Sequence, residues 1–117
     1  MNHERFLEGV GLFNQGKFYD AHEVLEDVWR PLPKGPARQF LQGLIQFAVA
    51  LHHHSKGNLA GATSLLVRAE RNVKHGDVAG ANLNAVVILE SMEQWKKYFH
   101  CGGAVPVGPR LRPPGET

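Results

Sequence analysis

Apolar residues recur every three or four positions in five segments of this 117-residue chain. That spacing puts them on one face of an α-helix, whereas a half-buried strand needs a strict alternation that the sequence sustains nowhere. Glycine or proline, which interrupt helices, separates the neighbouring segments. The sequence therefore predicts an all-α domain, a compact bundle of about five helices at about residues 4–14, 18–30, 36–55, 59–74 and 83–99.

The third segment is expected to lie at the centre of the bundle. It carries the least charge of the five, and its apolar stripe consists of Leu41, Ile45, Ala48 and Leu51. The short connection at residues 31–35 makes the second and third segments antiparallel, so they are predicted to form a central hairpin.

A single core suits a chain of 117 residues. Residues 1–100 are expected to form one helical domain, and the Pro/Gly-rich residues 101–117 an irregular C-terminal tail. Two arrangements of the tail stay open, one in which it lies across the body through Val105, Val107 and Leu111, and one in which it is mobile.

Residues 16–21 and 57–62 resemble each other. Each stretch places a glycine turn before a helix that has an alanine near its start. Two loose copies are too few for a solenoid, which needs about three stacked repeats. The favoured interpretation is that two helix-turn-helix joints are built in the same way.

Bulk composition argues against several functional classes. The net charge of +2 is spread along the chain, so no basic stripe suggests nucleic acid as a partner. The first residues lack the pattern of a signal peptide, and the most apolar stretch is too short to span a bilayer, so no membrane association is expected. Cys101 is the only cysteine, which fits a reducing, cytoplasmic setting.

The stretch "FYDAHEVLEDVW" at residues 18–29 contains the main candidate site. On a helix, His22, Glu26 and Trp29 share one face, at positions i, i+4 and i+7. This face borders the apolar one, so the three side chains are predicted to be partly buried. Glu23 lies on a different, outward face and is expected to be a solvated charge.

The third segment carries a matching polar stripe of Arg38, Gln42, Gln46 and His53. In an antiparallel hairpin Glu26 lies level with residue 40, and His22 with residue 44. We therefore expect Glu26 to contact Arg38, Gln42 or both, and His22 to contact Gln42 or Gln46. A buried amide without a partner costs about 1–3 kcal/mol, so these glutamines require an explanation.

No metal site and no cofactor are predicted. His22 and Glu26 supply two corners of a metal site, but a third protein ligand is missing and the pattern H-E-x-x-H is absent. The run His52-His53-His54 does not converge on one ion, because successive helical residues point about 100° apart. His54 is expected to face solvent.

Two functional classes remain open. In the favoured one, the polar residues form a network that sets helix register, and the protein is structural or binds another protein or a second copy of itself. In the alternative, His22 and Glu26 centre a pocket walled by Trp29 and Tyr19, which binds a small ligand or acts as acid and base, with a metal included in that class. The sequence does not decide whether the protein is an enzyme.

Two stretches, "LFNQGKFYDAHEVLEDVWR" and "RQFLQGLIQFAVALHHHSKGNLAGATSLLVRA", resemble the signature blocks of the small bacterial and archaeal DUF309 proteins. The resemblance extends over residues 6–89 and implies a compact all-helical domain. It implies no activity, because the function of that family is unknown. The family's motif falls on His22, Glu23, Glu26, Trp29, Gln42, Gly43 and Gln46, while the Pro-rich tail after His100 has no counterpart in it.

Overall fold

A computed structural model describes residues 1–76, 83–106 and Leu111. Over these residues the chain forms helices and no strand, which confirms the predicted all-α class. The predicted helix bounds are correct to within two residues. The five helices are α1 (His3–Asn14), α2 (Phe18–Trp29), α3 (Pro36–Ser55), α4 (Leu59–His75) and α5 (Ala85–Cys101).

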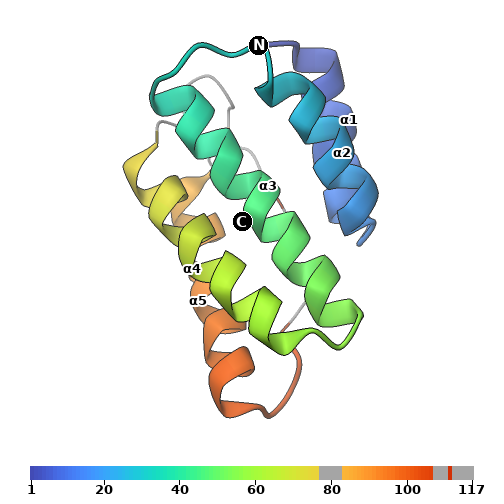
Figure 1. Ribbon diagram of the computed structural model, residues 1–117, viewed down its shortest axis with the longest axis vertical. Coiled ribbons are helices and arrows are strands. Elements are labelled where there is room, and N and C mark those ends of the chain that lie inside the picture. The colour runs from blue at the N-terminus through green and yellow to red at the C-terminus, as the bar shows by residue number, and fades with distance from the viewer. Residues whose placement is uncertain (77–82, 107–110, 112–117) are drawn as a thin grey trace.

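Helix α3 lies in the middle of the molecule, with α1 and α2 on one side and α4 and α5 on the other (Figure 1). Each helix packs on the next one along the chain, and the α3–α4 pair makes the most extensive contact. The apolar stripe predicted for α3 is buried as expected. The α2–α3 hairpin is antiparallel, since Trp29 contacts Arg38 near the connection and Tyr19 contacts His52 at the far end.

The two similar sequence stretches form two joints of the same geometry. Gly16 ends α1 and Gly57 ends α3 with φ of 81° and 79°, in the left-handed region that glycine adopts at little cost. At both joints the next residue donates its backbone N–H to a carbonyl five residues earlier, at 2.9 Å, in the Schellman arrangement. The same turn therefore closes the α1–α2 and the α3–α4 hairpins.

Helix α4 approaches α3 very closely at Gly43. A Cβ atom at this position would lie 2.7 Å from Val73 Cγ2 and 2.9 Å from the Val73 backbone nitrogen. Only glycine allows this distance, because the obstructing atoms include backbone. Gly43 therefore sets how α4 lies along α3.

The C-terminal stretch differs in part from the expectations. Helix α5 continues to Cys101, and Val105 is exposed rather than packed on the body. Leu111 is buried, and its backbone N–H and carbonyl both bond the amide of Asn14, at 2.7 and 3.2 Å. Val107, and most of the connector predicted at residues 76–80, lie outside the described residues.

An ion pair on the surface joins α1 to α2. Arg5 Nη2 lies 2.6 Å from Asp27 Oδ2, and Arg5 Nη1 lies 2.8 Å from Glu8. The hydrogen bond from Arg5 lowers the pKa of Asp27, with smaller contributions in the same direction from Arg30. Asp27 on α2 thus has an ion-pair partner on the neighbouring helix.

Substituting Gly43 tests the close helix approach. We expect Gly43→Ala to lower the free energy of unfolding by about 1–3 kcal/mol, the range for overpacking a well-filled site. Gly11→Ala is the matched control, because a Cβ there meets nothing within 4 Å. It should raise stability by about 0.5–1 kcal/mol, as usual for glycine in a helix. Urea unfolding measures both, and equal effects would contradict the close approach.

The Arg5–Asp27 pair predicts a pH dependence. Because the pKa of Asp27 is lower in the folded state, its contribution to stability is present above the unfolded-state pKa and is lost as pH falls through the folded-state value. Arg5→Gln should raise the pKa of Asp27 and make unfolding stability less dependent on pH in this acidic range. An NMR titration of the Asp27 carboxyl checks this, with exposed Arg68→Gln as the control. An unchanged Asp27 pKa in Arg5→Gln would refute the assignment.

Candidate functional site

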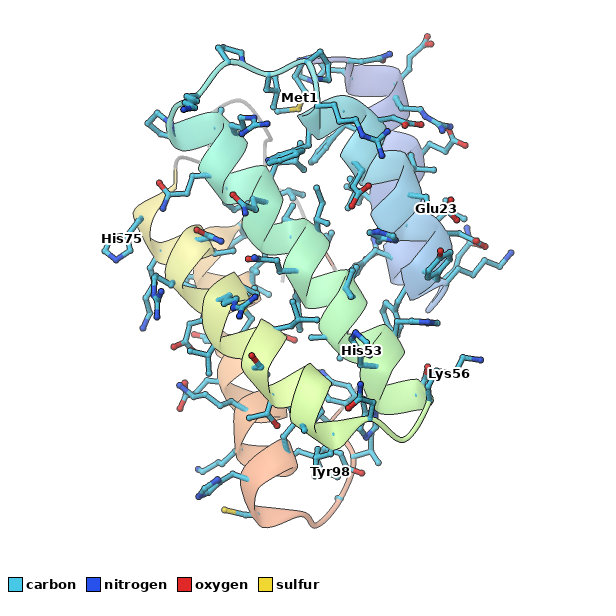
Figure 2. All side chains as sticks on the ribbon, in the orientation of Figure 1. Met1, Glu23, His53, Lys56, His75 and Tyr98 are labelled. Carbon is cyan, nitrogen blue, oxygen red and sulfur yellow. The ribbon has the colours of Figure 1, made fainter. Side chains whose placement is uncertain are left out.

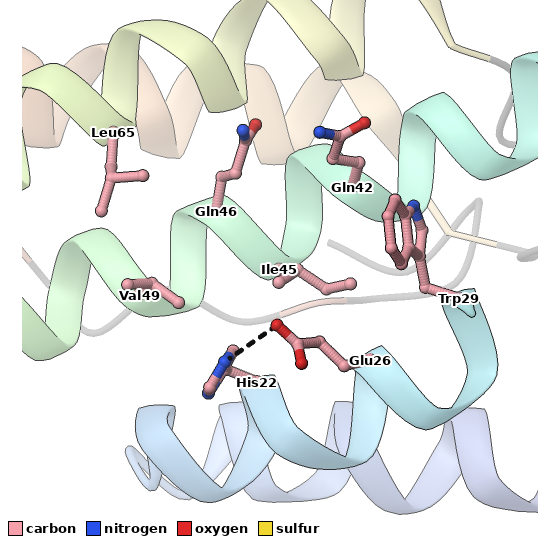
Figure 3. A pocket seen from close by; sticks show the side chains of 8 residues that line it. All are labelled: His22, Glu26, Trp29, Gln42, Ile45, Gln46, Val49 and Leu65. Carbon is pink, nitrogen blue, oxygen red and sulfur yellow. Dashed lines mark hydrogen bonds and ion pairs between the residues drawn. The ribbon is translucent and has the colours of Figure 1, made fainter.

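A cleft with a volume of about 340 Å³ opens between α2 and α4, over α3 (Figure 3). Helix α2 contributes three of the predicted residues and α3 contributes two, so the structure brings together five of the seven candidates. The residues that line the cleft are His22, Glu26, Trp29, Gln42, Ile45, Gln46, Val49 and Leu65.

His22 and Glu26 form a hydrogen-bonded pair on one face of α2. His22 Nε2 lies 3.1 Å from Glu26 Oε1, and His22 Nδ1 lies 3.1 Å from the Tyr19 carbonyl. Carbonyl and carboxylate oxygens can only accept hydrogen bonds. Both ring nitrogens of His22 can therefore donate at the same time only when each of them carries a proton. The side chains of His22 and Glu26 are 18% and 33% exposed, so solvent reaches the pair.

The second oxygen of Glu26 is bonded by Arg30. Arg30 Nη2 donates to Glu26 Oε2 at 2.9 Å, which gives the carboxylate one partner on each oxygen. Sequence reasoning missed Arg30, although the spacing of four residues from Glu26 is a signal for such a pair. The charge of Glu26 is therefore balanced by the residue that directly follows α2.

The contacts predicted between α2 and α3 are wrong. Neither His22 nor Glu26 bonds to Arg38, Gln42 or Gln46. Figure 3 shows the cause: Ile45 and Val49 stand between the two polar groups, and the glutamine side chains project towards α4. The apolar face of α3, rather than its polar stripe, meets α2.

Gln46 has its partner on α4. Asn72 Nδ2 donates to Gln46 Oε1 at 2.7 Å, and Gln39 Nε2 donates to Asn72 Oδ1 at 3.4 Å. The sequence held no signal for Asn72, because its pairing depends on the register of α4 against α3. The side-chain amide of Gln42 makes no hydrogen bond within the described part of the chain, and it lines both the cleft and a neighbouring hollow.

Arg38 lies on Trp29 instead of pairing with Glu26. The guanidinium carbon of Arg38 is 3.7 Å from the centre of the Trp29 ring, a cation–π contact. The indole Nε1 of Trp29 donates to the Arg38 carbonyl at 3.2 Å. These two contacts fix the orientation of the indole ring that closes one end of the cleft.

Other candidates lie outside the cleft. Glu23 is exposed on the outer side of α2 (Figure 2), as predicted. Tyr19 is half-exposed and packs on His22 and His52. It is not among the residues that line the cleft, so the prediction that it forms a pocket wall is wrong.

The three consecutive histidines have separate surroundings. His52 packs on Tyr19, and His53 Nδ1 lies 3.1 Å from the Asn58 amide. His54 was predicted to face solvent, and this prediction is wrong. Its ring packs against the rings of Trp95, Tyr98 and Phe99. The C-terminal end of α3 thus meets α5 through an aromatic cluster, which the sequence did not reveal.

The site has the groups for hydrogen bonding and proton transfer. Within residues 1–76, 83–106 and 111, no three His, Cys, Asp or Glu side chains are grouped so as to hold a metal ion. Nor is any helix of this part long and apolar enough to cross a membrane.

Comparison with known proteins places this site in a family. Residues 6–65 match the family described as domain of unknown function (DUF309). An uncharacterised protein of Bacillus subtilis, YpuF, is 35% identical over 78 residues, which cover 65% of this chain and 45% of the relative. An uncharacterised protein of Aquifex aeolicus is 37% identical over 66 residues, 56% of this chain and 20% of the relative. The chain spans less than half the length of these two relatives.

Glu26→Gln tests how much the polar pair contributes to folding. Each i, i+4 pair contributes about 0.2–0.5 kcal/mol, so the loss in free energy of unfolding should stay below about 1 kcal/mol. Urea unfolding measures it, with Glu90→Gln on the exposed surface of α5 as the control. A loss above about 3 kcal/mol would mark Glu26 as part of a sealed buried network instead.

Proposed function

Because the chain belongs to the DUF309 family, whose function is unknown, we propose a role for this domain from its site: it binds a small amphipathic ligand in the α2–α3–α4 cleft. The observation that carries the proposal is the open cleft itself, which combines an apolar base with hydrogen-bonding groups at its rim. Pockets of this kind, from about 300 Å³ upward, are the usual form of small-molecule sites.

The apolar part of the ligand would lie on three aliphatic side chains. Ile45 and Val49 come from α3, and Leu65 reaches the cleft from α4 (Figure 3). The Trp29 ring stands at one end and is held in place by Arg38, so it offers a preformed flat surface. A ligand with an aromatic or aliphatic group of modest size fits these surroundings.

The polar part of the ligand would meet Gln42 and the His22–Glu26 pair. The Gln42 amide has both a donor and an acceptor to offer, and it has no hydrogen-bond partner in the described part of the chain. His22 and Glu26 are partly exposed, so a ligand can exchange hydrogen bonds or a proton with them. Binding comes first in this proposal, and proton transfer is an additional capacity of the same pair.

A purely structural network is less well supported. That interpretation requires Glu26 to be enclosed by Arg38 and Gln42, whereas its partners are His22 and Arg30. A protein-binding face on α1 or α5 requires a contiguous apolar patch. The large exposed apolar side chains on the described parts of these helices are single ones, Leu7 and Val86.

We place this role in the cytoplasm, because the one cysteine, Cys101, is an exposed free thiol and thiols persist in reducing compartments. The proposal concerns this domain alone, since the relatives are longer than the matched segment.

Filling the cleft tests the proposed function. A panel of small amphipathic compounds, each an aromatic or aliphatic group with one amide or hydroxyl, is titrated into ¹⁵N-labelled protein. Binding should shift the indole N–H resonance of Trp29 and the side-chain amide of Gln42. Leu65→Trp should abolish these shifts by occupying the cleft, with the helical content unchanged.

Val67→Trp is the matched control, because Val67 lies on the exposed face of the same helix. It should leave binding as in the unaltered protein. The proposal fails if no compound shifts the cleft resonances, or if the shifts persist in Leu65→Trp.

A further inference from the structure

A second hollow, of about 440 Å³, lies beside the cleft at the start of α3. Gln42 lines both of them, so the two are neighbours along α3. The hollow differs from the cleft in the charge of the residues that line it. The hollow presents two cations, Lys34 and Arg38, together with the amides of Gln39, Gln42 and Asn72, and no acidic residue is among the residues that line it.

Arg38 is the half-buried cation of this hollow, and no carboxylate balances it. Its Nε–H is buried without an acceptor, and the guanidinium forms no ion pair with any described residue. Arg5, the other half-buried arginine described, is paired with Glu8 and Asp27. A half-buried charge without a counter-charge is unfavourable, which favours an anion at this place.

The backbone at the start of α3 adds N–H groups, which carry a partial positive charge. Gly35, the N-cap, has no side chain to accept from the first turn, and Pro36 has no N–H. The N–H groups of Ala37 and Arg38 therefore have no acceptor within the described chain, and the first turn contains no acidic residue. The positive end of the helix dipole lies here as well.

We propose that this hollow binds a phosphate group. Two cations match the charge of a phosphate dianion, and guanidinium, ammonium, amide and backbone donors match its oxygens. Because Gln42 joins the hollow to the cleft, the ligand is a phosphorylated small molecule whose apolar part lies on Ile45, Val49 and Leu65. This last step rests on the proposed function, whereas the phosphate site stands on its own residues.

Trp29 connects the two parts physically. Arg38 packs on its ring and receives its indole hydrogen bond through the backbone. An anion bound to the Arg38 guanidinium changes the electrostatic surroundings of the Trp29 ring. The resonance of the Trp29 indole N–H therefore responds to binding in the hollow as well as in the cleft.

The first experiment uses inorganic phosphate at constant ionic strength, with chloride as the balancing ion, and follows ¹⁵N resonances. We expect saturable shifts of the backbone N–H groups of Ala37 and Arg38. Lys34→Gln and Arg38→Gln together should weaken binding by about tenfold or more, since each removes a charge-assisted contact. Lys34→Gln alone, at an exposed side chain, should weaken it by a smaller factor without affecting the fold.

Lys56→Gln is the control, because it removes an equal charge at the opposite end of α3, where the side chain is exposed. It should leave phosphate binding unchanged. Shifts that are absent at Ala37 and Arg38, or equal binding by the double variant and the unaltered protein, would overturn the phosphate site.

The second experiment compares phenyl phosphate with inorganic phosphate. The phenyl group should make binding about tenfold tighter by entering the cleft, and Leu65→Trp should remove only this gain. If phosphate binds but phenyl adds nothing, the link to the cleft is refuted and the phosphate site stands. If cleft compounds bind and phosphate does not, the proposed function stands and this inference fails.

Discussion

The close contact of α4 with Gly43 of α3 is the constraint on which the rest of the arrangement depends. With no side chain at Gly43, the Val73 backbone nitrogen lies 2.9 Å from where a Cβ would be. This contact fixes the register that brings Asn72 to Gln46 and Leu65 to the edge of the cleft. Helix α2 packs on the other side of α3, and the cleft is the space left between α2 and α4.

Charge is divided unevenly around this space. Beside the cleft, the Glu26 carboxylate is bonded by His22 and by Arg30, the residue that follows α2. The hollow at the start of α3 is lined by Lys34 and Arg38 and by no acidic residue, and the backbone N–H groups of the first turn add to the positive potential. This difference in charge is the reason why an amphipathic group is proposed for the cleft and an anionic group for the hollow.

Much of the fold followed from the helical period, because side-chain spacing within a helix is a local property. The bounds of α3 and the buried positions Leu41, Ile45 and Ala48 were predicted correctly for this reason. The grouping of His22, Glu26 and Trp29 in one site was predicted from the same period. The hydrogen-bond partners of these residues were not, since partners depend on the rotation of one helix against another.

The wrong predictions have the same cause, because they concern contacts between different helices. The hairpin rule gave the antiparallel direction of α2 and α3 but not the rotation of α3, so Ile45 and Val49 stand where glutamines were expected. His54 was predicted to face solvent, whereas it packs on Trp95 and Phe99 of α5, a helix that is distant in sequence. Contacts between segments far apart along the chain leave little trace in local spacing.

By itself, the sequence determined that this protein is a bundle of helices with a polar face on α2 and a glycine in α3, because both depend on residues within a few positions of each other. Tertiary structure alone decided that Gln46 bonds Asn72, that Arg38 lies on Trp29, and that an open cleft remains beside Glu26. The physical reason is that packing of large apolar side chains sets helix rotation, and the polar groups then take the partners that this rotation leaves within reach.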